Sequence, residues 1–138
     1  MATQNVLIFR DGIETGYEMM ANARQVTVIT VVAPYFPQIM YEGEGSYYAK
    51  AEDKQKMYAT ILAILEAAAE AGCKVLVLSA FGCGAFAKPV KEVAELFYAA
   101  LTKFQDKFGA IVFVIIDEII DAPTKEHGGC KIKLLHLQ

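Results

Sequence analysis

The feature that most constrains the fold of this chain is an unbroken passage from a strand pattern, through a glycine-rich turn, into a helix. An apolar, β-branched run covers residues 75–80, and the turn after it contains Gly82 and Gly84. Pro89 then fits the first turn of a helix, where its missing N–H is not needed. In α/β proteins this order forms an anion site from backbone amides and the helix N-terminus. The segment predicts a ligand site, with a plain tight turn as the alternative reading.

The composition is typical of one compact domain. A chain of 138 residues predicts a single domain, residues 1–138, with a hydrophobic core. Hydrophobic residues make up 55% of the chain, which indicates a largely buried sheet. The net charge is −3 and no basic stripe interleaved with aromatic residues occurs, which argues against a nucleic-acid binder. A local phosphate site needs no overall positive charge, so a nucleotide-sized ligand remains open.

The cysteines and the apolar runs predict the cellular compartment of the protein. Cys73, Cys83 and Cys130 are an odd number without a CxxC pair, which is typical of reduced thiols and not of a disulfide framework. The first residues lack the layout of a signal peptide, and the longest apolar runs are too short to span a bilayer. These patterns predict a soluble, cytoplasmic protein with no membrane partner.

Hydrophobic periodicity predicts strands that alternate with helices. Strands are expected at residues 5–9, 25–33, 75–80 and 111–116, with a weaker edge strand at 131–137. Amphipathic helices are expected at 52–71, with Gly72 as the stop signal, and at 89–106, whereas 35–51 is expected to be a loop. The order predicts an α/β fold with three layers, two main helices and a mostly parallel sheet of four to five strands.

Ligands of such sheets bind beyond the carboxyl ends of the strands. The segments expected to meet there contain Ala33, Pro34 and Tyr35, residues Phe81 to Lys88, and Asp117 with Glu118. We expect the amides of residues 82–86 to hold a phosphate or diphosphate, because successive amides and a helix N-terminus attract anions. Phe81 and Phe86 are candidates to cover a sugar or a base.

Cys83 is open to a catalytic reading. It follows a strand and precedes a helix, where nucleophiles are often exposed and helix dipoles lower the pKa of a thiol. It would need a base, for which the sequence offers His127 and His136. Phe81 and Ala85 stand where a nucleophile elbow has glycines, and a lone cysteine in an apolar loop is more often a buried small hydrophobe.

Three other groups of residues carry weaker signals. His127, Cys130 and His136 are too irregularly spaced for a metal site, so no metal is predicted. The acidic residues after the last apolar run suit either ribose hydroxyls or a solvated strand end; they are Asp117, Glu118 and Asp121. Four tyrosines suit either the wall of a base pocket or an edge that self-associates; they are Tyr35, Tyr41, Tyr47 and Tyr48.

Five segments in this order resemble the C-terminal portion of the microbial-type poly(ADP-ribose) glycohydrolases, a branch of the macrodomain fold. They are residues 6–11, 28–34, 76–86, 92–97 and 112–117, of which the Gly82-Cys83-Gly84-Ala85-Phe86 block is the specific part. The resemblance implies a macrodomain-like fold in which this loop binds the diphosphate of ADP-ribose. It also implies that Phe86 lies against the distal ribose.

The chain departs from that family in three places. The family's catalytic glycine run, followed by a glutamine and paired glutamates, is not in this sequence. Tyr35 follows Ala33-Pro34 where the family often has a small polar residue, and Ala87-Lys88-Pro89 replaces an asparagine-containing turn. The fold is therefore expected to be truncated on its N-terminal side relative to the family. The sheet edge this exposes predicts a homo-oligomer or a partner subunit.

Three functions follow as expectations. The first is a module that binds ADP-ribose or a related nucleotide diphosphate without hydrolysis, since the glutamates that would act on the ribosyl bond are missing. The second is an ADP-ribosyl glycohydrolase that acts with a partner half or through another carboxylate, for which the candidates are Glu42, Glu44, Asp117 and Asp121. The third is a structural protein with a vestigial pocket. None of them requires a cofactor.

Overall fold

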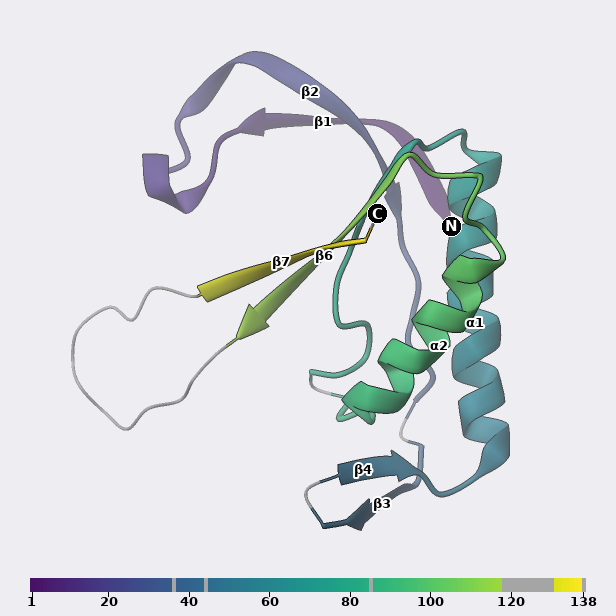
Figure 1. Ribbon diagram of the computed structural model, residues 1–138. Helices are drawn as coiled ribbons and strands as arrows, with labels where there is room; N and C mark the ends of the chain where they lie inside the picture. The colour runs from purple at the N-terminus through teal and green to yellow at the C-terminus, as the bar shows by residue number, and fades with distance from the viewer. Residues whose placement is uncertain (36, 44, 85, 118–130, 138) are drawn as a thin grey trace, which may run out of the picture.

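The computed structural model describes residues 1–35, 37–43, 45–84, 86–117 and 131–137, with side chains described through residue 115 (Figure 1). Within these residues the chain forms α-helices α1 (Ala51–Glu70) and α2 (Val90–Thr102) and a short 3-10 helix, η1 (Ile13–Thr15). The strands are β1 (Ala2–Arg10), β2 (Met19–Ile29), β3 (Ile39–Glu42), β4 (Gly45–Tyr48), β5 (Val75–Leu78), β6 (Ala110–Asp117) and β7 (Lys131–Leu137).

Helix α1 has the predicted buried face and the predicted end. The apolar positions at helical spacing are all buried: Met57, Ile61, Ile64, Leu65 and Ala68. Gly72 has a φ of 73° and donates its amide to the carbonyl of Ala69 at 3.0 Å, while Cys73 donates to Ala68 at 3.0 Å. This pair of bonds is a Schellman motif, which needs the left-handed conformation that glycine adopts without strain. The predicted stop at Gly72 is confirmed.

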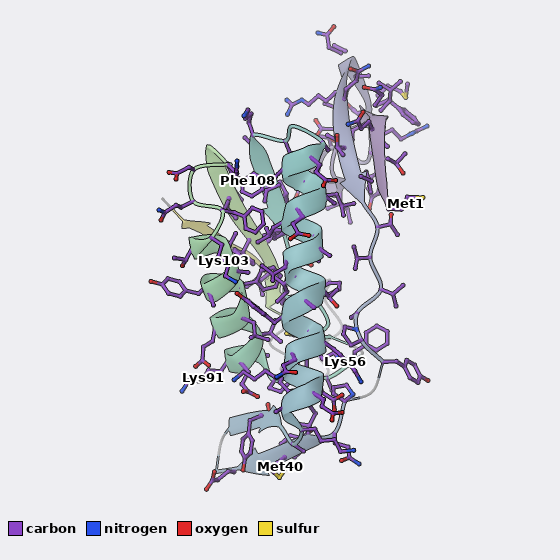
Figure 2. All side chains as sticks on the ribbon, turned by 90° about the vertical axis from the view of Figure 1, so that its right-hand side faces the viewer. Met1, Met40, Lys56, Lys91, Lys103 and Phe108 are labelled. Atoms are coloured by element: carbon purple, nitrogen blue, oxygen red, sulfur yellow. The ribbon has the colours of Figure 1, made fainter. Side chains whose placement is uncertain are left out.

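Helix α2 is present but shorter than predicted. Pro89 is its N-cap and not its first helical residue, with extended backbone at φ −63° and ψ 106°. The helix ends at Thr102, after which the chain makes turns up to residue 107. Phe97 packs edge-to-face on Phe113 of β6, with ring centroids 5.3 Å apart. Both helices lie on the same side of β5 and β6 (Figures 1 and 2), so the described residues form two layers and not the predicted three.

The chain is α/β, as predicted, but the mostly parallel sheet of four to five strands is not found among the described residues. Three small sheets are present, with the strand orders β1-β2, β3-β4 and β5-β6-β7. Among the paired strands only β5 and β6 are parallel, and helix α2 connects them as a crossover. β1 and β2 are connected by a few residues around η1, and so short a connection allows antiparallel pairing alone. The predicted edge strand, β7, pairs antiparallel with β6.

One strand prediction was wrong in its bounds, and one loop prediction was wrong. The run expected at 25–33 begins earlier and ends at Ile29, so Ala33 and Pro34 lie in the connection that follows. The segment expected to be a loop, 35–51, contains the hairpin of β3 and β4, in which Glu42 pairs with Gly45. Gly43, with a φ of 58°, begins its two-residue turn, which needs the positive φ that glycine supplies.

Candidate functional site

The loop between β5 and α2 is closed by its own backbone hydrogen bonds. Cys83 donates to the carbonyl of Ala80 at 3.0 Å, Ala87 to Gly84 at 2.8 Å and Lys88 to Gly82 at 3.1 Å. Gly82 has a φ of 76°, a left-handed conformation that favours glycine. The loop is therefore a defined turn at the carboxyl end of β5, where the sequence predicted a ligand site.

Among residues 81–88 of this loop, three amides have no acceptor in the described part of the chain. They are the amides of Gly82, Gly84 and Phe86. The amides of Phe81, Cys83, Ala87 and Lys88 all donate to carbonyl oxygens of residues 79–84. A Cβ built on Gly84 would meet no atom within 4 Å, so this part of the loop faces open space. The first turn of α2 follows directly and has no side-chain cap, which leaves its amides available too. Such amides are the donors that an anion needs.

The loop is brought against the connection that follows β2. The rings of Tyr35 and Phe86 meet edge-to-face with centroids 6.3 Å apart. A Cβ on Gly82 would lie 3.3 Å from the Cβ of Ala33, which is buried. Two of the three segments predicted to meet, 33–35 and 81–88, are therefore in contact. Tyr35 and Phe86 together form an aromatic edge beside the unpaired amides.

Asp117, the third predicted segment, lies at the end of β6. β5 ends at Leu78, which pairs with Phe113, so Asp117 is four residues further along β6. At about 3.3 Å per residue this places its backbone about 13 Å beyond the end of that pairing. The described part of the chain does not include the side chain of Asp117. It also does not include Glu44, Ala85 or residues 118–130, which contain Glu118, Asp121, His127 and Cys130. Their predicted roles stay predictions.

The buried side chain of Lys88 links the two contacting segments, 33–35 and 81–88. Its side chain is only 3% exposed, and its Nζ donates to the carbonyl of Pro34. Burial lowers the pKa of Lys88, while the nearby Asp53 and Cys83 oppose that change. In the sequence Lys88 stands out only as a departure from the family pattern, and this link was not predicted. The only signal was a lysine directly before a helix-starting proline.

Cys83 is half-buried and hydrogen-bonded. Its Sγ lies 3.8 Å from the carbonyl oxygen of Phe81, to which the thiol donates. Burial raises the pKa of the Cys83 thiol, and Lys88 opposes that rise. A raised pKa disfavours the thiolate that a nucleophile needs. The described side chains include no histidine that could act as its base.

A buried polar cluster lies beside the loop, built from β4, α1 and α2. Glu92, in the first turn of α2, accepts the backbone amide of Tyr48 at 2.5 Å and pairs with Lys54. The Tyr48 hydroxyl is buried without a hydrogen-bond partner among the described residues. Burial raises the pKa of Tyr48, and the charges of Cys83, Glu92 and Asp53 raise it further. Tyr48 is thus a residue of the hydrophobic core.

An apolar cavity of about 760 Å³ lies between β2 and β5 and reaches the start of the loop at Ser79 and Phe81. These strands are not paired with each other, so each has an unpaired edge on this side. None of the lining residues is charged, and the walls include Val26, Val28, Leu76, Val77 and Phe97. Such a cavity suits an apolar polypeptide segment better than a nucleotide.

Two negative findings hold for the described residues alone. No three of their histidine, cysteine and acidic side chains are grouped so as to hold a metal ion. No helix among them is long and apolar enough to cross a membrane.

Comparison with known proteins gives one match. Residues 6–97, more than half of the chain, match the family model described as Macro domain. No curated protein and no solved structure matches the chain. The matched range contains the whole loop between β5 and α2 and most of α2, so the aligned region includes the candidate site.

Proposed function

This chain belongs to the Macro domain family, whose members generally bind ADP-ribose or related ligands, and we propose that it binds ADP-ribose or a related nucleotide diphosphate through residues 82–86. The observation that carries this proposal is the set of three amides without acceptors at Gly82, Gly84 and Phe86, directly before the N-terminus of α2. A diphosphate is the group that such a set of donors recognises.

The energetics fit a modest affinity. Each charge-assisted hydrogen bond contributes roughly 1.5–3 kcal/mol, so three contribute roughly 5–9 kcal/mol. Aromatic contact with Phe86 and Tyr35 adds about 1 kcal/mol, which the costs of association partly offset. The expected dissociation constant therefore lies between about 1 μM and 1 mM.

We propose that residues 1–138 by themselves bind without hydrolysis. Within these residues no glycine run followed by a glutamine and paired glutamates occurs, and these are the catalytic residues of the microbial-type poly(ADP-ribose) glycohydrolases that the chain resembles. Among the described side chains, Asp53 is the carboxylate whose charge acts on both Lys88 and Tyr48 behind the loop. The charge of Asp53 acts on buried groups, and no observation indicates that Asp53 would contact the ribosyl bond of a ligand.

The test is calorimetric titration of ADP-ribose into the wild type and into Gly84→Glu. Because a Cβ at Gly84 meets nothing within 4 Å and no positive φ is required there, the substitution leaves the fold intact. Its carboxylate repels a diphosphate, and we expect binding to be lost. Gly109→Glu is the matched control at the other end of β5 and β6, where a Cβ is in ordinary contact with the Lys74 carbonyl oxygen at 3.6 Å. No heat from wild type and ADP-ribose would falsify the proposal.

A second measurement separates binding from catalysis. The protein is incubated with a substrate carrying ADP-ribose on a side chain, and free ADP-ribose is quantified by chromatography. Binding without release supports the proposed function. Release that disappears in Gly84→Glu supports the glycohydrolase alternative. Absence of both binding and release leaves the structural role.

We further propose that the protein associates with a second copy of itself. The cavity between β2 and β5 is uncharged, and the hairpin of β1 and β2 exposes large apolar side chains: Leu7, Ile8, Phe9 and Met19. One chain thus carries both an apolar cavity and an apolar projection, and two copies would cover both. A stable interface needs about 800 Å² from each copy, and these surfaces are candidates to supply it.

Light scattering tests this association. Val77 of β5 is 71% exposed and lines the cavity, so Val77→Lys is expected to yield a monomer. Tyr98 is exposed on α2 and does not line the cavity, so Tyr98→Lys is expected to keep the wild-type mass. A wild type that is monomeric at every concentration overturns the proposal.

The location we propose is the cytoplasm. Cys73 and Cys83 are both free thiols, as expected of a protein in a reducing compartment. Thiol titration of freshly isolated protein should find both reduced, and a mixed disulfide on either would contradict this location.

A further inference from the structure

Behind the loop lies a buried lysine with little to balance its charge. Lys88 is 3% exposed, and its Nζ makes one hydrogen bond, to the carbonyl of Pro34. No carboxylate lies within 4 Å of it in the described part of the chain. A buried ammonium normally has an ion-pair partner, because removal from water is costly. The site therefore favours an anion close to Lys88.

The position of the Lys88 side chain relative to the loop is well defined. Its Cγ and Cε lie 3.0 and 3.4 Å from the point where a Cβ on Gly82 would be. Since a C–N bond is about 1.5 Å long, Nζ lies within about 5 Å of that point. The ammonium is thus directly behind the first glycine of the segment whose amides have no acceptors.

We infer that Lys88 supplies the counter-charge for the ligand's diphosphate and so selects phosphorylated over neutral nucleosides. This inference rests on the proposed function, since it uses the same loop. The protonated Lys88 ammonium carries a full positive charge, which a nearby anion stabilises, whereas the amides of Gly82, Gly84 and Phe86 are neutral donors. At a distance of several ångströms in a partly buried site, such a charge changes anion affinity about tenfold or more.

Other charges around Lys88 reduce the effect without cancelling it. Asp53, on the first turn of α1, and Cys83, in the loop, both act on Lys88. Tyr48 and Glu92 belong to the same cluster through Cys83 and Asp53. The Asp53 carboxylate lies 4.0 Å from Lys56 Nζ and is shared with that residue. Lys88 is therefore only partly neutralised from within the protein.

The experiment compares Lys88→Met, which keeps the length of the side chain, with Lys88→Arg, which keeps the charge. Lys107→Met is the control, because Lys107 is exposed in the turns that follow α2, at the opposite end of that helix from the loop. Each protein is titrated with ADP-ribose and with inorganic pyrophosphate at two salt concentrations, and its folding is checked by thermal melting. We expect Lys88→Met to bind both anions at least about tenfold more weakly, with a weaker dependence on salt. Lys88→Arg and Lys107→Met should stay within a few-fold of wild type.

The outcomes separate this inference from the proposed function. If the wild type binds ADP-ribose and Lys88→Met binds it equally well, the counter-charge is wrong and the binding function stands. If affinity falls but the salt dependence is unchanged, Lys88 only positions the loop through Pro34, and the inference is overturned. If pyrophosphate binds in a Lys88-dependent way but ADP-ribose does not, the anion site stands and the proposed ligand fails. If neither anion binds, both fail.

Discussion

Two regions of the described chain, the N-terminal hairpin and the central helices with β5, differ in how they are stabilised. The part formed by α1, β5 and α2 buries the side chains of the core, including Met57, Leu65 and Phe97. The hairpin of β1 and β2 contains no buried residue, and its tip around η1 extends away from both helices (Figure 1), while Ile29 at its base packs against the core. The candidate site belongs to the first part, since its loop joins β5 to α2. The geometry of the site should therefore survive changes in the hairpin but not changes in the core.

The largest expected effect comes from the core. Leu65 is 0% exposed in α1, and Leu65→Ala should lower the free energy of unfolding by about 3–5 kcal/mol, because it removes apolar contacts and leaves a cavity. Leu7 is 54% exposed in β1, and at concentrations where the protein is monomeric Leu7→Ala should change the free energy of unfolding by less than about 0.5 kcal/mol. Urea denaturation of both variants measures the difference. Equal losses would show that the hairpin is packed against another surface in solution.

The next effect concerns the link between the site and the core. Glu92 accepts the Tyr48 amide and pairs with Lys54, and its side chain is mostly buried. Glu92→Ala should lower the stability by about 1–3 kcal/mol, because it leaves that buried amide without an acceptor. Glu95→Ala, on an exposed position of the same helix, is the control. A loss equal to that of the control would mean that water replaces the carboxylate.

The sequence predicted the core better than it predicted the sheets, for a physical reason. Helical periodicity is a local signal, and the positions at 57, 61, 64, 65 and 68 are buried as expected. Strand pairing depends on distant segments, so neither the β3–β4 hairpin nor the separation of β2 from β5 followed from local pattern. The apolar run at 25–33 satisfied a strand pattern over its full length, but the paired segment ends at Ile29.

The same distinction holds for the candidate site. The turn at Gly82 and Gly84 could be predicted, because glycines that directly follow a strand pattern are typical of a tight turn. The contact of residues 33–35 with the loop followed from the rule for strand ends. Lys88, Tyr48 and Glu92 could not be predicted, since their roles depend on burial and on partners 44 to 54 residues away. A lysine in a sequence is normally taken to be exposed.

A smaller effect is expected at Tyr48, and it depends on pH. Its hydroxyl is buried without a partner among the described residues, so Tyr48→Phe should raise the stability by about 1 kcal/mol at neutral pH. Burial raises the pKa of Tyr48 above its ordinary value of 10.0, so folding favours the protonated form. The wild type should therefore lose stability as the pH rises above 10, and Tyr48→Phe should lose less. Urea denaturation between pH 8 and pH 11 measures both, and parallel curves for the two proteins would contradict the assignment.

The smallest expected effect concerns the backbone conformation at one position in each of the two regions. Ala87, in the loop, has a φ of 46°, and Asn5, in β1, has a φ of 60°. Alanine is strained in this left-handed region, whereas asparagine tolerates it. Ala87→Gly should therefore raise the free energy of unfolding by up to about 1 kcal/mol, while Asn5→Gly should leave it nearly unchanged. If Ala87→Gly also weakens ADP-ribose binding, the strain at Ala87 helps to hold the amides of the loop in place; unchanged binding would mean that Lys88 and the loop's own hydrogen bonds suffice.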